Sequence, residues 1–213
     1  MKTTIIIASC LCGVLNAATI SIPASVDGAV QSSGVLGLSV TNDTINSTLR
    51  SGGANIRQSI FEFDISTISS SALVTEAYFE FDTTTASNTG GNPVEFRIDG
   101  FVGDGVIGTG DFDSNEASGG DLVYSGDLVT GSSANTSLSL QLTDLTSLQS
   151  AITSGEDYFG LRTETNNFAT LGIRSLENTT GADPVLRLVV VPEPSVSFLA
   201  SFACLFLFRR RRA

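Results

Sequence analysis

The chain has 213 residues with 11 Lys and Arg against 22 Asp and Glu, a formal charge of −11, three cysteines, no histidine and no tryptophan. Without histidine there is no Ser-His or Cys-His nucleophile pair and no imidazole to bind a metal, so histidine-based catalysis is excluded. The acidic charge also argues against a nucleic-acid partner.

Residues 1–18 predict a secretory signal peptide. Lys2 precedes an apolar run over residues 5–15, and Ala17 and Ala18 are small residues of the kind found at a signal peptidase site. The run is about half of the ~20 residues that a membrane-spanning helix needs, so we expect cleavage. Lipidation is the alternative, because Cys10 ends an Ile-Ala-Ser-Cys sequence of the lipoprotein type.

Residues 19–191 are expected to form one ectodomain with six arginines, 21 acids and no cysteine, and therefore a formal charge of −15 and no disulfide. Short apolar stretches separated by Gly, Asn, Asp and Ser predict an all-β fold, either a sandwich or a barrel. The expected strands lie at 19–22, 35–40, 59–65, 76–82, 94–101, 122–124, 137–142, 158–162, 170–174 and 185–190.

One short helix is expected within this β domain. Leu145, Leu148 and Ile152 recur at helical spacing after Asp144, a residue type favoured at the N-cap, and Gly155 is placed to end the helix. The loops at 83–93 and 103–120 are long and polar, with glycines that predict turns. Loops of this kind are where binding residues usually gather.

Carboxylates alternate with phenylalanines in Phe61-Glu62-Phe63-Asp64 and again in Phe79-Glu80-Phe81-Asp82. Alternate residues of a strand share a face, so each pair of carboxylates lies ~6.6 Å apart on the polar side. Glycosidases use pairs at ~5 to 9.5 Å, which makes Glu62 and Glu80 the residues to replace if the protein is a hydrolase. Any strand with acids on its solvent side has the same spacing, and we expect the protein not to be an enzyme.

Oxygen ligands for a cation occur in the second long loop. Asp111, Asp113, Asn115 and Glu116 could supply Ca²⁺, which takes carboxylate and amide oxygens from flexible loops. The pattern of a helix-loop-helix calcium site fails, since glycine is missing at its sixth position and the twelfth is Leu122. The alternative is a solvated acidic loop and no cofactor.

Residues 192–213 contain three consecutive features. Pro192-Glu193-Pro194 is followed by an apolar stretch over residues 196–208, which ends at Arg209, Arg210, Arg211 and Arg212. As a helix the stretch reaches only ~20 Å, short of a ~30 Å hydrocarbon core. The arginines hold this end on the cytoplasmic side by the positive-inside rule. Two interpretations are open, a marginal tail anchor or a sorting signal that is cut near Pro-Glu-Pro.

This order of motif, short hydrophobic helix and arginine cluster resembles the PEP-CTERM sorting signal of Gram-negative bacteria. The resemblance implies export through the inner membrane, transient anchoring by the C-terminal helix and recognition of Pro192, Glu193 and Pro194 by a membrane enzyme, an exosortase. It further implies delivery to the cell surface or extracellular matrix, in association with exopolysaccharide. Signal peptidase and the exosortase would then be this chain's processing partners.

A second resemblance covers most of the ectodomain. Residues 56–84, 142–165 and 171–190 are similar to blocks of DNRLRE-type domains, with a helix start at Asp144, Gly160-Leu161 in a strand, Ser175 and Glu177, and a closing Pro184. Proteins of this family are similar to carbohydrate-binding modules with a jelly-roll sandwich. The resemblance therefore implies a jelly-roll-like antiparallel sandwich and an extracellular polysaccharide partner.

Tyrosines are the aromatic residues left for stacking against a sugar in a chain without tryptophan. Tyr78 shares its expected strand face with Glu80, and Tyr124 lies on another strand, so these three residues are the candidate ligand-binding set. The alternatives for the ectodomain are a structural matrix protein without a discrete ligand site and a glycan-active hydrolase.

Overall fold

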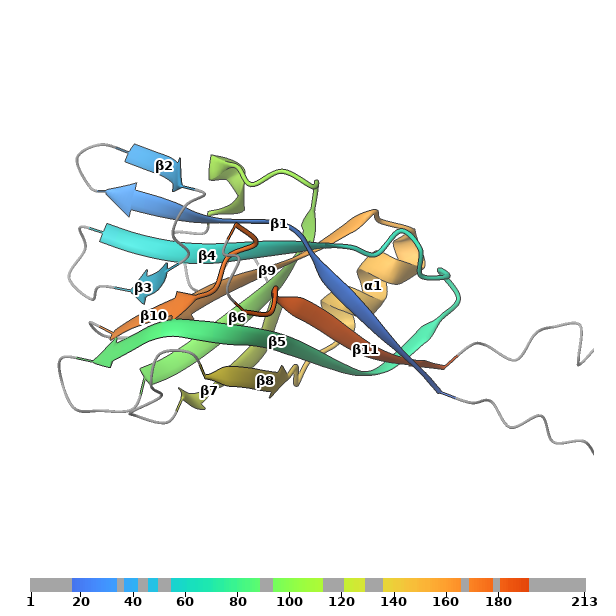
Figure 1. Ribbon diagram of the computed structural model, residues 1–213. Coiled ribbons are helices and arrows are strands. Elements are labelled where there is room, and N and C mark those ends of the chain that lie inside the picture. Colours follow the sequence, from blue (N-terminus) through green and yellow to red (C-terminus); the bar gives the residue numbers. More distant parts are fainter. Residues whose placement is uncertain are drawn as a thin grey trace, which may run out of the picture.

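The structure is a computed structural model that describes residues 17–33, 37–41, 46–49, 55–88, 94–112, 121–128, 136–165, 169–177 and 181–191. These residues contain eleven strands, a 3-10 turn η1 and one helix α1 (Figure 1). The elements are β1 (Ala18–Ser33), β2 (Gly37–Thr41), β3 (Asn46–Leu49), β4 (Asn55–Asp64), β5 (Leu73–Asn88), β6 (Val94–Gly103), η1 (Thr109–Asp111), β7 (Asp121–Leu128), β8 (Ser137–Gln141), α1 (Thr146–Ser154), β9 (Tyr158–Thr165), β10 (Ala169–Ile173) and β11 (Val185–Val191).

The prediction of an antiparallel all-β fold with one short helix is confirmed. Each expected strand overlaps one of the observed strands, although β1 and β5 extend well beyond the expected ranges. The N-cap of the helix is Leu145 and not Asp144 as expected, although the Asp144 side chain accepts a hydrogen bond from the Thr146 N–H at 2.8 Å. The helix ends at Gly155, whose φ of 74° lies in the left-handed region that favours glycine. The buried face of α1 carries Leu148 and Ile152 as the spacing predicts.

The strands form two layers with shared members. In sheet A, the first part of β1 pairs with β11, β11 pairs with the first part of β5, and β5 pairs with β8. In sheet B, β2, the second part of β1, β4, β9, β6 and β7 pair in that order. Strands β10 and β3 connect the second part of β5 to β4. A register shift between Ala24 and Val26 marks where β1 passes from one sheet to the other.

The core lies between the two sheets and is built around phenylalanines. The Phe79 ring of β5 lies 5.2 Å from the Phe61 ring of β4, 6.2 Å from Phe63 and 4.7 Å from Phe81, measured between centroids. Phe96 of β6 extends the cluster. Aliphatic side chains of β1, β9, β11 and α1 pack around these rings. Aromatic rings bury large apolar areas, so this cluster supplies much of the stability of a domain without cysteine.

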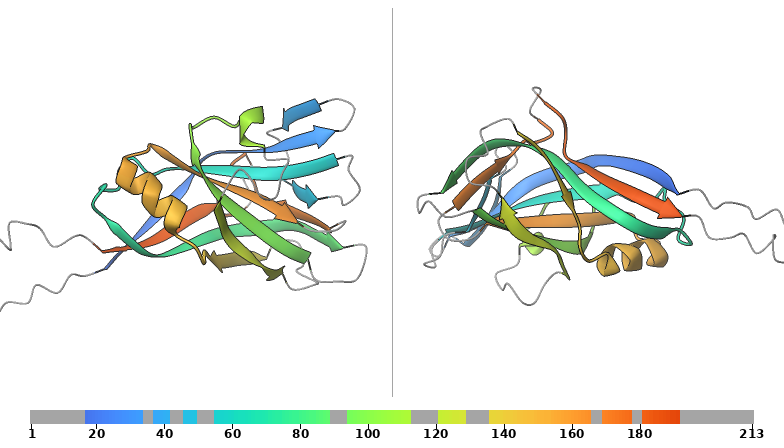
Figure 2. Two further views of the ribbon diagram at one scale, coloured as in Figure 1. Left: turned by 180° about the vertical axis from the view of Figure 1, so that it is seen from behind. Right: turned by 90° about the horizontal axis from the view of Figure 1, so that it is seen from below.

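Helix α1 connects the two sheets at one end of the domain, between β8 and β9 (Figure 2). The Gln149 side chain fixes it to the start of β5, donating to the Ala72 carbonyl at 3.0 Å and accepting from the Val74 N–H at 2.9 Å. Ala18 pairs with Val190 in the β1–β11 ladder, so both ends of the described domain lie at this same end (Figures 1 and 2).

Candidate functional site

A row of polar side chains lies on the outer face of sheet A. Tyr78 and Glu80 of β5 alternate with the buried residues Ala77 and Phe79, so they point away from the core. Arg187 of β11 is the register partner of Tyr78, and its guanidinium carbon lies 3.9 Å from the centroid of the Tyr78 ring. The structure thus brings two of the three predicted ligand residues together, with an arginine stacked on the aromatic ring.

Ion pairing and hydrogen bonds hold this row in place. The Arg187 Nε lies 2.6 Å from Glu80 Oε1, and the Ser139 hydroxyl of β8 donates to the same oxygen at 3.1 Å. The Tyr78 hydroxyl donates to Glu76 Oε2 at 2.7 Å, and this hydrogen bond raises the pKa of Tyr78. The hydrogen bond and the ion pair together give the planar groups of Tyr78 and Arg187 a fixed orientation on an accessible face.

Beside Glu80, a hollow of about 350 Å³ opens between β5, β8 and the start of β11. Asp82 lines it and accepts hydrogen bonds from the Ser137 hydroxyl at 2.5 Å and from the Ala182 N–H at 3.1 Å. The Ser137 hydrogen bond is the main cause that lowers the pKa of Asp82. Asp183 lines the same hollow. The hollow offers charged and hydroxyl oxygens on the same strand as Tyr78, a combination suited to sugar hydroxyl groups.

Tyr124, the third predicted ligand residue, does not belong to this row. It lies on β7 in sheet B and packs against the core, with its ring 6.5 Å from that of Phe96. A side chain at Gly126 would come within 2.7 Å of the Tyr124 hydroxyl, so that glycine leaves room for the ring. Burial raises the pKa of Tyr124. Its environment is that of a partly buried packing residue.

Glu62 lies under a loop and not on a solvent-facing surface as expected for the acids of β4. Asp64 is exposed, but Glu62 is fully buried because residues 104–112 fold across the outer face of sheet B. The Gly105 N–H donates to Glu62 Oε2 at 2.5 Å. A Cβ at Gly103 would come within 2.6 Å of the Glu62 carboxyl carbon. Burial raises the pKa of Glu62.

The two acids considered for hydrolysis point in opposite directions. Phe61 and Phe79 face each other across the core at 5.2 Å, and their strand neighbours Glu62 and Glu80 project from the outer faces of different sheets. Glycosidase carboxylates flank a single bond. Glu62 and Glu80 therefore do not face a common cleft. Of the pairs considered along each strand, Glu62 is buried while Asp64 is exposed, and Glu80 and Asp82 lie together on the outer face of sheet A.

Asp111 is the described member of the predicted cation loop. Its Oδ2 accepts a hydrogen bond from the Gly108 N–H at 2.7 Å, and its carbonyl oxygen accepts one from Arg162 at 2.8 Å. Burial raises the pKa of Asp111. Asp113, Asn115 and Glu116 lie outside the described residues. Within the described part of the chain, no three or more acidic or cysteine side chains are grouped so that they could hold a metal ion.

The predicted sorting segment also lies outside the described residues. It comprises Pro192, Glu193, Pro194, Arg209, Arg210, Arg211 and Arg212, and Cys10 at the other end is likewise not described. Among the residues that are described, no helix combines the length and apolar character needed to cross a bilayer.

Comparison with known proteins adds no family assignment. No family model and no curated protein matches the chain. The two family resemblances therefore stay predictions.

Sequence reasoning missed Arg187 as a member of the candidate site. The signal was present in Val185-Leu186-Arg187-Leu188, where a lone charged residue alternates with buried leucines and must therefore face outward. Its neighbour across the ladder was not predictable, because pairing of β11 with β5 joins segments about a hundred residues apart.

Proposed function

We propose that this chain is an exported, surface-sorted, non-catalytic β-sandwich protein that associates with extracellular polysaccharide through the outer face of sheet A. The observation that carries the binding proposal is the fixed group of Tyr78, Arg187 and Glu80, with 3.9 Å between the guanidinium carbon and the ring centroid and 2.6 Å in the ion pair. A rigid aromatic edge beside paired charges can contact a sugar ring and its hydroxyl groups with little loss of side-chain entropy.

The resemblance to carbohydrate-binding modules supports this proposal, and it carries the finer fold proposal of a jelly roll. Two features agree with it, namely the sharing of β1 and β5 between the sheets and the accessible polar face of sheet A. Our proposal includes no resident cofactor. The alternative is a structural Ca²⁺ held by Asp111, Asp113, Asn115 and Glu116, which metal removal with EDTA tests.

Binding is tested with residues 19–191 against a panel of bacterial and algal polysaccharides, in Ca²⁺ and in EDTA. We expect saturable binding to one class of polysaccharide, weakened by Arg187→Lys because lysine keeps the charge but lacks the planar group that stacks on Tyr78. Arg97→Lys is the matched control, since Arg97 also pairs with an acid on a strand and has nearly the same side-chain exposure, 28% against 29%.

Two results would count against the binding site. Equal losses in both lysine variants would mean that the effect is not local to sheet A. An absence of binding across the whole panel would favour a sorted structural matrix protein. The DNRLRE resemblance would then support the fold alone and not a ligand.

Sorting is tested separately in cells that carry an exosortase-type system. The proposal rests on the order of Pro192-Glu193-Pro194, the apolar stretch and the arginines. Replacing the three motif residues with alanine should leave the full-length chain in the membrane fraction. Unchanged processing of that variant would refute the sorting proposal without affecting the binding proposal.

A further inference from the structure

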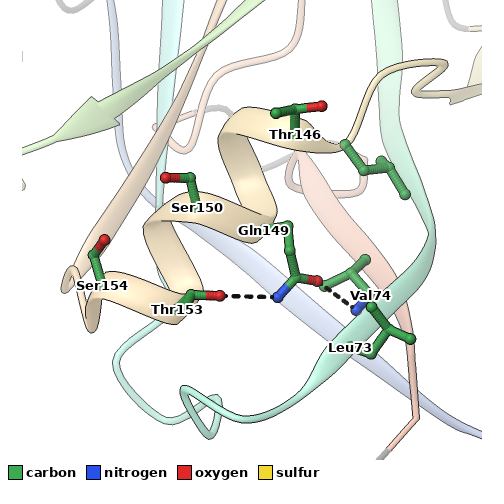
Figure 3. Close-up of a pocket in the computed structure, with 8 residues that line it drawn as sticks. Leu73, Val74, Thr146, Gln149, Ser150, Thr153 and Ser154 are labelled. Atoms are coloured by element: carbon green, nitrogen blue, oxygen red, sulfur yellow. Dashed lines mark hydrogen bonds between the residues drawn. The ribbon is translucent and has the colours of Figure 1, made fainter.

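A second hollow, of about 530 Å³, lies between α1 and the start of β5 (Figure 3). Leu73, which is 53% exposed, lines it together with four hydroxyl residues of α1, namely Thr146, Ser150, Thr153 and Ser154. Gln149 spans the gap through its bonds to β5 and to the Thr153 hydroxyl. None of the described residues that line this hollow is charged.

The chain leaves the described domain beside this hollow. Val191, the last residue of β11, pairs with Leu73, and Val190 pairs with Val74, so the wall of the hollow and the exit strand belong to one ladder. Pro192 follows directly, with no intervening linker. Because successive Cα atoms are 3.8 Å apart, the Cα of Glu193 lies at most about 7.6 Å from that of Val191.

This spacing restricts how a processing enzyme can reach the motif. An enzyme that holds Pro192-Glu193-Pro194 in its active site must place its own surface against the end of the domain from which β11 emerges. Leu73 and α1 are at that end. The hollow there is a neutral surface with hydroxyl groups and one exposed leucine on a domain whose formal charge is strongly negative. It suits an apolar side chain and hydrogen-bonding groups of a partner, not a basic patch.

We propose that the hollow between Leu73 and α1 is a docking surface for the membrane-embedded enzyme that cuts near Pro-Glu-Pro. This inference rests on the proposed sorting function and adds a recognition element outside the motif. The folded domain then contributes to substrate recognition, and the enzyme distinguishes this chain from an unfolded segment with the same motif.

The test measures the rate of processing of the full chain in cells by pulse-chase. Ser150→Arg places a large charged group in the hollow and improves helix propensity, so the domain should stay folded. Thr109→Arg is the matched control, because Thr109 is also an exposed hydroxyl residue and lies on η1, which contacts β2. We expect Ser150→Arg to slow processing about tenfold, which corresponds to about 1.4 kcal/mol, and Thr109→Arg to leave the rate unchanged.

A variant with an inserted linker distinguishes the loss of docking from a general defect in processing. Six Gly and Ser residues inserted between Val191 and Pro192 move the motif up to ~20 Å from the hollow. The inserted chain should be processed more slowly than wild type, and adding Ser150→Arg to it should cause no further loss. Equal rates for Ser150→Arg and wild type would overturn the docking proposal, and so would the same tenfold loss with the linker present, since the arginine would then act on the lipid contact or on export.

Failure of the sorting proposal itself has a different signature. If alanine replacement of Pro192-Glu193-Pro194 leaves processing intact, the sorting function is wrong and the docking surface loses its partner. If that replacement blocks processing while Ser150→Arg has no effect, sorting stands and docking alone is refuted.

Discussion

Asp27 gives the sharpest prediction because the carboxyl group is buried with one oxygen unsatisfied. It lies on β1 with 6% exposure, and its Oδ2 accepts a hydrogen bond from the Leu176 N–H at 2.8 Å. Its Oδ1 accepts none from the described residues. Burial raises the pKa of Asp27 from 3.8 to about 6, and the negative charges of Glu177 and Asp183 add to the effect.

The pKa shift fixes the sign and size of the effect on stability. Since the folded state holds the proton more tightly than the unfolded state, Asp27 contributes most to the free energy of unfolding below pH 3.8, and that contribution is lost as the pH rises through about 6. A shift of about two pKa units corresponds to about 3 kcal/mol. Asp27→Asn keeps the shape and an acceptor for Leu176 but carries no charge at any pH.

We therefore expect Asp27→Asn to match wild type near pH 3.5 and to exceed it by up to about 3 kcal/mol near pH 7.5. Urea unfolding of residues 19–191 across this range measures the difference. Asp64→Asn is the control with the opposite sign, because hydrogen bonds from Ser66 lower the pKa of the exposed Asp64, and its contribution is lost as the pH falls. A difference between Asp27→Asn and wild type that stays constant with pH would refute the assigned burial.

Three further predictions concern close packing and metal. Gly103→Ala should lower the free energy of unfolding, measured with urea, by about 1–3 kcal/mol, because the added Cβ would meet the buried Glu62 carboxyl group. Gly110→Ala is the control and should leave that free energy unchanged, because no atom lies within 4 Å of its added Cβ. Phe79→Ala should lower the free energy of unfolding by about 3–5 kcal/mol, because it opens a cavity among the three phenylalanine rings of Phe61, Phe63 and Phe81, and this is measured as a lower urea midpoint. EDTA should leave the melting temperature unchanged; a fall that Asp111→Asn abolishes would instead reveal a structural Ca²⁺.

The sequence predicted the helices and strands whose limits are set by neighbouring residues, and it missed those that depend on distant strands. Helix α1 could be placed because Asp144 and Gly155 act on neighbouring backbone groups at its two ends. Strand β3 was missed because Asn46–Leu49 has no alternating pattern. This segment is a strand because it pairs with β10 and β4. The lengths of β1 and β5 were underestimated for the same reason, since each continues into a second sheet whose partners are distant in sequence.

In the candidate site, too, the sequence predicted the features set by neighbouring residues and missed those that depend on distant segments. Alternation in β5 placed Tyr78 and Glu80 on one outward face, as the structure confirms. The burial of Glu62 was not predictable from β4, since it depends on a loop some forty residues later that closes over it. Gly103 and Gly105 indicated a turn in the sequence, and only the fold shows that these glycines also make room for Glu62 and for the ring of Tyr158.

The end at which β11 leaves the domain connects the two proposals. Residues 19–191 are strongly acidic, whereas α1 itself carries no charged residue, although the exposed acids Asp144, Glu156 and Asp157 flank it; α1 lies at the end where β11 leaves the domain. Under the proposed sorting, residues 196–208 hold the chain at the membrane, so the end from which β11 leaves lies nearest the bilayer. Strands β5 and β11 run from that end, which leaves the outer face of sheet A directed sideways. Tyr78 and Arg187 can then meet polysaccharide while α1 faces the processing enzyme, so docking and glycan binding need not compete.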